Sequence, residues 1–229
     1  TYKILTDNKE LIENRIGVSP EVVKILQRNK NKKRFVDADE KLLTEDPDEI
    51  LNNDEIDIVV EMLGGIEPAT SFMLQAMENG KHVISANKAA IAANYDKLVN
   101  TAKKNNVEFL FEASVAGGIP VLTAITNALA ANNYVEVMGI LNGTTNYILT
   151  KMINDGESFE NALADAQEKG YAERNPSADV DGIDACRKIA ILASLAFGKH
   201  VDSNQISTEG ITKISLDDVA YAQKIGHSI

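Results

Sequence analysis

Short apolar runs alternate with helix-like stretches through the first half of this chain, and this alternation restricts its fold more than any other feature. Apolar, β-branched runs predict strands over 22–26, 56–63, 82–85 and 107–111, the first two of them buried. Helical spacing lies between them, over 42–52, over 68–79 and along the stripe of Ile91, Tyr95, Leu98 and Ala102. Alternation of this kind predicts an α/β fold with a parallel sheet.

The pattern changes after residue 115. From the glycine pair at 117 and 118 onward we predict a helix over about 120–131, a strand over 135–141, helices after Gly143 and a helix over 216–226. We therefore expect two domains, 1–115 and 116–229.

Charge and composition exclude several classes of function. With 23 Lys and Arg against 34 Asp and Glu, the formal net charge is −11, which disfavours nucleic acid and anionic membranes as partners. No apolar run reaches the roughly 20 residues of a membrane span, and the first residues lack a signal-peptide core, so we expect a cytoplasmic protein. One cysteine, Cys186, and three histidines provide neither an internal disulfide framework nor a zinc-ligand pattern. Chemistry must then rest on lysines, carboxylates and backbone groups.

Two of the predicted strands end in residues suited to a ligand. Gly64 and Gly65 follow one strand and Lys88 follows the next, which places them at the carboxyl edge where parallel sheets bind ligands. A lysine at a helix start opposes the helix dipole, so an anionic partner is expected for it. The alternative is a simple turn and a solvated lysine.

A basic cluster follows the first predicted strand, at the position where dinucleotide-binding folds recognise the ribose. It consists of Arg28, Lys30, Lys32, Lys33 and Arg34. Basic residues there favour NADP over NAD. A solvated, charged loop is the alternative interpretation.

Two further turns combine polar groups with a helix start. Glu112 precedes the turn that holds Gly117, and oxygen ligands there suit a hard cation, although an exposed turn explains the pattern equally well. Asn142, Gly143 and Thr144 begin another predicted helix, whose free N–H groups suit a carboxylate. Helix capping alone also explains these residues.

The densest group of polar residues lies between 170 and 188. Asp184 and Lys188 are four residues apart on one helix face, in the order that favours an ion pair. Residues 189–197 are almost entirely apolar, so the helix runs from solvent into a core and Lys188 lies at the junction. With Asp179, Asp184 and Glu173 nearby, the Lys188 amine is placed to transfer a proton.

These motifs resemble the homoserine dehydrogenase family. The resemblance rests on five blocks in the expected order between about residues 56 and 211: 63–65, 86–88, 117–120, 142–148 and the group from Gly170 to Lys188. It implies an NAD(P)-dependent oxidoreductase that interconverts L-homoserine and L-aspartate 4-semialdehyde, on the route to threonine and methionine. Another Rossmann dehydrogenase acting on an amino-acid aldehyde fits the combination of blocks less well.

The resemblance also implies roles for single residues. Lys188 matches the proton donor, Glu173 the carboxylate that receives the substrate amino group, and Asp179 and Asp184 the residues that hold the amine and orient the lysine. The other substrate residues implied are Gly143, Thr144 and Tyr171. The implied cofactor residues are Lys88, shared with substrate, together with Gly64 and Arg28, for NADP with NAD possible. Glu112 and the carbonyls of Val115, Gly117 and Ile119 resemble a monovalent cation site, with sodium expected.

Some features depart from the family pattern. The Gly-x-Gly-x-x-Gly loop does not occur in the sequence. We expect the sequence to begin inside the helix that should follow this loop, and to end before the strands by which the family returns to its first domain. Asn175 lies where an aspartate is common. We therefore expect an incomplete Rossmann-type sheet over 1–115, lacking its first strand and glycine-rich loop, followed by an α+β substrate-binding and dimerisation domain over 116–229. Two possibilities stay open: a homodimeric enzyme, or a catalytically silent fragment that keeps the substrate pocket and dimer surface without binding dinucleotide.

Overall fold

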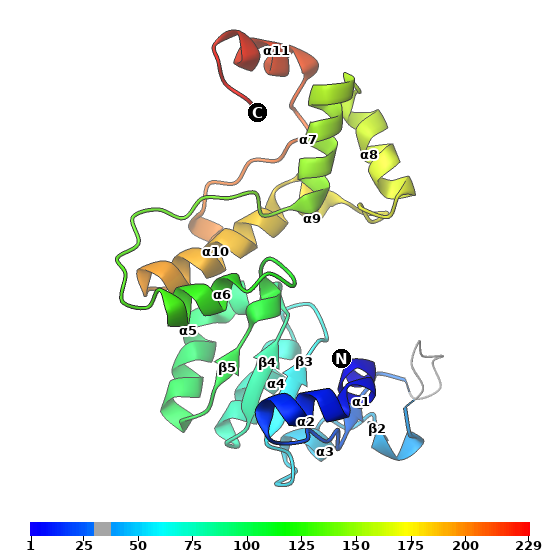
Figure 1. Cartoon of the computed structure of the whole chain (residues 1–229), viewed down its shortest axis with the longest axis vertical. Helices are drawn as coiled ribbons and strands as arrows, with labels where there is room; N and C mark the ends of the chain where they lie inside the picture. The colour runs from blue at the N-terminus through cyan, green and yellow to red at the C-terminus, as the bar shows by residue number, and fades with distance from the viewer. Residues whose placement is uncertain (30–37) are drawn as a thin grey trace. The chain divides into compact units, whose positions relative to one another are not determined.

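The computed structural model describes residues 1–29 and 38–229, which form two compact units (Figure 1). The first unit contains residues 1–61, 67–84 and 98–110, and the second contains 62–66, 85–97 and 111–229. Of the basic cluster, only Arg28 lies within the described residues; Lys30, Lys32, Lys33 and Arg34 lie outside them.

The first unit is built on parallel strand pairing. Strands β1 (Ile25–Leu26) and β2 (Leu43–Thr44) form a parallel pair, with Ile25 opposite Leu43. A second sheet has the order β3 (Ile58–Glu61), β4 (His82–Ser85) and β5 (Phe109–Leu110), in which β4 and β5 are parallel. The predicted parallel α/β architecture is thus confirmed, although β1 and β5 are shorter than the runs that predicted them.

The first unit also contains helices. They are α1 (Tyr2–Asp7), α2 (Lys9–Ile16), the 3₁₀ turn η1 (Glu40–Leu42), α3 (Asp48–Leu51), α4 (Ala69–Glu78) and the later part of α5 (Lys88–Asn105). Fully buried side chains of Met73, Met77, Val83 and Leu98 form the core between α4, β4 and α5. The helices predicted over 68–79 and along the Ile91 stripe are confirmed.

One face of the three-stranded sheet remains apolar and exposed. Ile58 and Val60 on β3, Ile84 on β4 and Leu110 on β5 are all at least 37% exposed, while Val83 is fully buried. The prediction of a buried strand over 56–63 was therefore half wrong: the strand exists over 58–61, but alternate side chains point to a face that the described residues leave open. The strand over 22–26 is likewise only partly buried.

The helix predicted over 42–52 was wrong in its first half. Leu43 and Thr44 form β2, and only Asp48–Leu51 is helical, as α3. Both residues pair with β1 and are buried, and the carbonyl of Thr44 accepts from the N–H of Gln27 at 2.9 Å, so tertiary pairing overrides the helical spacing.

The second unit is mainly helical. After the start of α5 it contains the 3₁₀ turn η2 (Glu112–Ser114), α6 (Val121–Thr123), the π turn η3 (Ala124–Ala128), α7 (Gly143–Asp155), α8 (Phe159–Glu168), α9 (Ser177–Val180), α10 (Ile183–Phe197), η4 (Ser203–Gln205) and α11 (Leu216–Lys224). Helices α7 and α8 lie side by side (Figure 1). Ile148 and Met152 of α7 pack there against Ala162 and Ala166 of α8.

The strand predicted over 135–141 was wrong. This segment is irregular and forms no strand pairing with the described residues, and Val135, Met138 and Ile140 are at least 80% exposed. Its alternating β-branched residues suit a strand, but a strand forms only where another backbone supplies hydrogen bonds.

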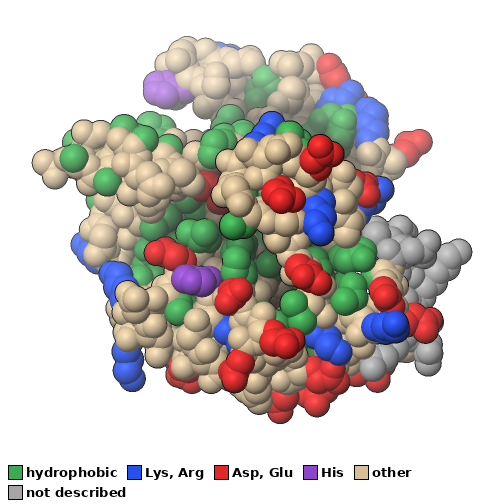
Figure 2. All heavy atoms as spheres, turned by 60° about the horizontal axis from the view of Figure 1, so that its bottom comes forward, with side chains coloured by type: hydrophobic (Ala, Val, Ile, Leu, Met, Phe, Trp, Pro, Cys, Tyr) green, Lys and Arg blue, Asp and Glu red, His purple; other side chains and the backbone are tan. Residues whose placement is uncertain are grey.

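Charged side chains are distributed over the surface in agreement with the net charge. Figure 2 shows Asp and Glu side chains spread over the face that comes forward, between apolar patches. Within residues 1–29 and 38–229, no helix is long and apolar enough to cross a membrane.

Candidate active site

Helix α10 places Asp184 and Lys188 on one face. The helix begins after Gly182, whose positive φ of 82° ends the preceding short helix α9 and turns the chain. Asp184 lies in the first turn, where its charge agrees with the helix dipole. Farther along, Ile191 and Leu192 are buried, so the helix does run from the site into a core, as predicted.

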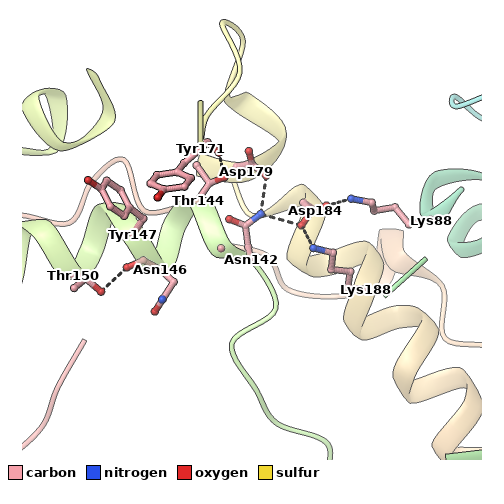
Figure 3. Close-up of a pocket in the computed structure, with 11 residues that line it drawn as sticks. Lys88, Asn142, Thr144, Asn146, Tyr147, Thr150, Tyr171, Asp179, Asp184 and Lys188 are labelled. Carbon is pink, nitrogen blue, oxygen red and sulfur yellow. Dashed lines mark hydrogen bonds and ion pairs between the residues drawn. The ribbon is translucent and has the colours of Figure 1, made fainter. Parts of the chain in front are cut away.

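Asp184 is the centre of the site (Figure 3). Its Oδ2 lies 2.6 Å from Nζ of Lys188, and its Oδ1 lies 2.5 Å from Nζ of Lys88. The Nδ2 group of Asn142 donates a third hydrogen bond to Oδ2 at 2.9 Å. Because Asp184 is only 6% exposed, these donors replace the water that it has lost.

The same contacts determine the protonation state of Asp184. Burial by itself would raise the pKa of this carboxyl group. Hydrogen bonds from Lys188, Lys88 and Asn142, with the positive charge of Lys188, outweigh burial and lower the pKa below its ordinary value. Asp184 is therefore ionised at neutral pH and carries the charge that holds both lysines.

Lys88 reaches the site from the first turn of α5. Asn87, which is buried, accepts a hydrogen bond from the N–H of Ala90 and donates one to the carbonyl of Gly65 at 2.7 Å. These bonds fix the start of α5, where Lys88 is the first residue. The anionic partner expected for Lys88 is thus the Asp184 carboxylate.

The turn before α7 completes the network. The carbonyl of Leu141 accepts a hydrogen bond from Nζ of Lys188 at 2.8 Å. Asn142 is the N-cap of α7, since its Oδ1 accepts from the N–H of Thr145 at 2.8 Å. Its Nδ2 bonds Asp179 at 2.6 Å as well as Asp184. One turn therefore contacts both members of the Asp184–Lys188 pair.

An open pocket of about 580 Å³ lies over this network. Its lining consists of Lys88, Asn142, Gly143, Thr144, Asn146, Tyr147, Thr150, Tyr171, Asp179, Asp184 and Lys188. The structure thus brings together seven of the residues predicted for catalysis or substrate binding: Lys88, Gly143, Thr144, Tyr171, Asp179, Asp184 and Lys188. Two of the lining residues are joined directly, since the hydroxyl of Thr144 donates to the carbonyl of Tyr171 at 2.7 Å.

Two tyrosines form one wall of the pocket. The rings of Tyr147 and Tyr171 lie 4.9 Å apart with a tilt of 52°. The hydroxyl of Tyr147 donates to Asp165 and accepts from Lys169 at 2.8 Å. These bonds hold the Tyr147 hydroxyl in place, while Tyr171 is largely exposed.

The structure leaves other predicted residues outside this pocket. Glu173 is exposed and does not line it; its backbone carbonyl accepts from Gln167 at 3.0 Å. Arg28 belongs to the first compact unit and is exposed. Gly64 belongs to the second unit, has a φ of 79°, and has open space where a Cβ would lie.

Glu112, predicted as a cation ligand, caps α6. Its Oε1 accepts from the N–H of Leu122 at 2.9 Å, and its Oε2 accepts from the N–H and hydroxyl of Thr123 at 2.7 and 2.6 Å. Burial would raise the pKa of Glu112, but these hydrogen bonds lower it. The carbonyl of Ile119 accepts from the N–H of Val121 at 2.9 Å. Within the described residues, no group of three His, Cys, Asp or Glu side chains is placed to hold a metal ion.

The sequence analysis did not identify three groups that belong to the site. The Asn142 side chain was interpreted as a cap, and its donor group faces two carboxylates as well. Tyr147 lies one helical turn after Thr144, and that spacing is a usable signal for a shared face. The Leu141 carbonyl left no signal, because any residue type supplies the same backbone group.

Comparison with protein families gives two matches that together cover nearly the whole chain. The model described as "Homoserine dehydrogenase, NAD binding domain" matches residues 1–112, and the model described as "Homoserine dehydrogenase" matches residues 120–229.

Curated relatives include the homoserine dehydrogenases of Bacillus subtilis and Synechocystis. The first is 37% identical over 99% of this chain and 52% of its own length, and the second is 44% identical over 96% and 52%. The chain thus spans about half the length of these relatives.

Solved structures give the same result. A homoserine dehydrogenase from Thiobacillus denitrificans matches all of this chain and 53% of its own, with 40% identity and a TM-score of 0.90. A hyperthermophilic archaeal homoserine dehydrogenase in complex with NADPH matches 75% of this chain and 53% of its own, with 31% identity and a TM-score of 0.69.

Proposed function

Because this chain belongs to the homoserine dehydrogenase family, we propose that it serves the NAD(P)-dependent interconversion of L-homoserine and L-aspartate 4-semialdehyde, on the route to threonine and methionine. The observation that carries the proposal is the Asp184 carboxylate, which binds two lysines in the pocket of the second unit.

Lys188 is the proton donor in this proposal. Its ammonium has three hydrogens, and two of them bond Asp184 and the Leu141 carbonyl. The third is available to the oxygen that changes between hydroxyl and aldehyde. In the direction of aldehyde reduction, Lys188 gives a proton to the developing alkoxide, and in the reverse direction it takes one. Asp184 keeps the amine in place and balances its charge.

The substrate ammonium requires a carboxylate partner. Asp179 lines the pocket and accepts one hydrogen bond from Asn142, so its remaining lone pairs can receive the ammonium. Glu173 receives the same role from the family motif. Gly143 and Thr144 supply the turn that contacts the substrate, and Tyr171 supplies an aromatic wall.

The cofactor proposed is NADP, with NAD as the alternative. When bound, it supplies or accepts the hydride at the substrate carbon. Gly64 leaves room for the cofactor, because the space that a Cβ would occupy at this position is open. Arg28 has the charge that a ribose 2′-phosphate requires, and the family motif implies that Lys88 is shared between substrate and cofactor. The archaeal relative in complex with NADPH supports the choice of NADP.

A monovalent cation, with sodium expected, is proposed near Glu112. Support comes from the carboxylate, whose lowered pKa keeps it charged, and from the family motif, which assigns the carbonyls of Val115, Gly117 and Ile119 to the same cation. The hydrogen bonds to α6 use both lone pairs of Oε2 and one of Oε1, so one lone pair of Oε1 remains for a cation. Thermal unfolding in NaCl and in choline chloride at equal ionic strength tests the site. A higher midpoint in NaCl that Glu112→Gln removes supports it; equal midpoints contradict it.

We further propose a homodimeric, cytoplasmic protein. The proposal follows from the family motifs and from a chain with a single cysteine. Sedimentation equilibrium tests the dimer, and a monomer at all concentrations would contradict it.

Reduction of NADP by L-homoserine, followed by nicotinamide absorbance, tests the proposed reaction. Turnover is expected with NADP and slower turnover with NAD. Equal values of kcat/KM with NADP and NAD would contradict the proposed preference for NADP. A folded chain without turnover, in which L-homoserine still binds, would favour the silent fragment that retains the substrate pocket and dimer surface without binding dinucleotide.

A further inference from the structure

The two ends of the Asn142 side-chain amide have different partners. The oxygen accepts from the N–H of Thr145 at 2.8 Å and so caps α7. A backbone N–H only donates, so this contact fixes which end of the amide is oxygen. The nitrogen therefore faces the opposite side, where Asp179 and Asp184 lie.

The nitrogen supplies one hydrogen to each carboxylate. Nδ2 lies 2.6 Å from Oδ1 of Asp179 and 2.9 Å from Oδ2 of Asp184. That second oxygen is the one that also binds Lys188. Both hydrogens of the amide are used, and Asn142 is only 6% exposed, so water cannot easily replace it.

Leu141, the residue before Asn142, contacts the other member of the pair. The carbonyl of Leu141 accepts from Lys188, while the amide of Asn142 donates to Asp184. The turn before α7 therefore contacts the lysine with an acceptor and the acid with a donor. A shift of this turn moves both members of the pair.

We infer that Asn142 is a positioning residue, which connects the start of α7 to the Asp184 carboxylate and thereby sets where Lys188 presents its proton. The inference rests on the proposed function for its effect on turnover. It goes beyond helix capping, because a cap needs only the oxygen end of the amide.

The charged groups around Asp184 determine how loss of the Asn142 amide would change the ionisation of Asp184. Lys188 of α10 and Lys88 of α5 face it with positive charge, and Asp179 of α9 faces the same amide with negative charge. Asn142 separates the two carboxylates by donating to both. Without the amide, no shared donor offsets the repulsion between Asp179 and Asp184, and Asp184 loses one hydrogen bond. Both changes raise the pKa of the Asp184 carboxyl group.

Three substitutions separate capping from positioning. Asn142→Ser keeps an N-cap oxygen but supplies at most one hydrogen to the carboxylates. Asn142→Asp keeps the cap and adds a third negative charge. Asn142→Ala removes both functions. Ser158→Ala is the matched control, because it removes the Ser158 cap of α8, which bonds Asn161, outside the pocket.

The decisive measurement is the carboxyl titration of Asp184 by ¹³C NMR, which does not depend on turnover. We expect the titration midpoint to rise by about one pH unit in Asn142→Ser and further in Asn142→Asp, and to stay unchanged in Ser158→Ala. In the NADP assay, kcat should fall about 10- to 100-fold in Asn142→Ser with little change in KM. The midpoint of thermal unfolding should fall most in Asn142→Ala, which loses both the cap and the donor to Asp184. It should also fall in Asn142→Ser and Asn142→Asp, which weaken the ionised form of Asp184, and in Ser158→Ala, which loses a cap.

An unchanged Asp184 titration in Asn142→Ser would overturn the inference and leave Asn142 as a cap alone. A wild-type protein without turnover would instead count against the proposed function, and the titration would still decide the role of Asn142.

Discussion

Lys188 follows Asp184 by one turn of α10, and its Nζ lies 2.6 Å from Oδ2 of that carboxylate. The other oxygen of Asp184 binds Lys88, which comes from a different helix. One buried carboxylate thus holds two amines at the edge of the pocket. Ion pairs four residues apart are common on exposed helices and contribute little there. Burial and the second lysine distinguish this pair from those.

Loss of the Lys188 amine should stop proton transfer while the fold remains. We expect Lys188→Ala to lower kcat by about 10²- to 10⁴-fold, the usual contribution of a positioned general acid. Lys151→Ala is the matched control, because Lys151 also pairs with an aspartate four residues away but does not line the pocket. Wild-type turnover in Lys188→Ala would remove this residue from the proton-donor role.

Asp184 should make stability depend on pH in the acidic range. Its pKa is lowered in the folded protein, so the folded state binds the proton less tightly than the unfolded chain does. The stabilisation is present above the unfolded pKa of about 3.9 and is lost as the pH falls through the folded value. Asp184→Asn should be less stable by about 1–3 kcal/mol at pH 7, and the difference should shrink below pH 4.

Urea unfolding of both proteins between pH 7 and pH 2 measures this difference. The pKa values of Glu112, Asp165 and Asp218 are lowered as well, and they make stability depend on pH in the same direction. Their contributions are the same in both proteins, so they cancel in the difference between the two stabilities. A constant difference over this range would show that the folded protein does not favour the ionised form of Asp184.

Glu173 provides a test of substrate contact. If it receives the substrate ammonium, Glu173→Ala should raise KM for L-homoserine about 10-fold or more and change kcat less, because a charge-assisted hydrogen bond is lost. Glu168→Ala serves as the control, since this residue ends α8 and does not line the pocket. Unchanged KM would agree with the exposed position of Glu173 and leave Asp179 as the carboxylate for the ammonium.

A close backbone crossing holds the loop that precedes α10. A Cβ on Gly210 would lie 2.4 Å from the carbonyl oxygen of Val180 and 2.7 Å from Cα of Asp181. The N–H of Ile211 also donates to that carbonyl at 2.8 Å. Gly210→Ala should therefore destabilise the protein by about 1–3 kcal/mol or more, because backbone must move.

Gly139→Ala is the control for this prediction, since its Cβ would meet only the end of the Leu141 side chain, at 3.9 Å. Chemical denaturation of the two variants gives the comparison. Equal stabilities would show that the backbone around Gly210 moves to accept a Cβ without loss of stability.

Much of the site was predictable because its residues are close in sequence. Asp184 and Lys188 share a helix face by spacing alone, and Gly143 and Thr144 follow from a helix start. The contact between Lys88 and Asp184 spans 96 residues, so the sequence indicated only that Lys88 needed an anion. The role of Asn142 was hidden because capping already explained it.

The limits of the fold prediction have a similar cause. Helix α4 and strand β4 were predicted well, since flanking glycine and proline mark their ends. The segments over 42–52 and 135–141 depend on pairing with distant backbone. The first has a partner in β1 and becomes a strand, and the second has none among the described residues and stays irregular.

Titration of the ¹⁵N-labelled chain with L-homoserine, followed by two-dimensional NMR, tests the central claim most directly. The account predicts saturable shifts concentrated at the amides of Gly143, Thr144 and Tyr171 and around Asp184, and weaker binding in Asp179→Ala. Shifts confined to residues outside this pocket, or no saturable shifts in a folded protein, would contradict it.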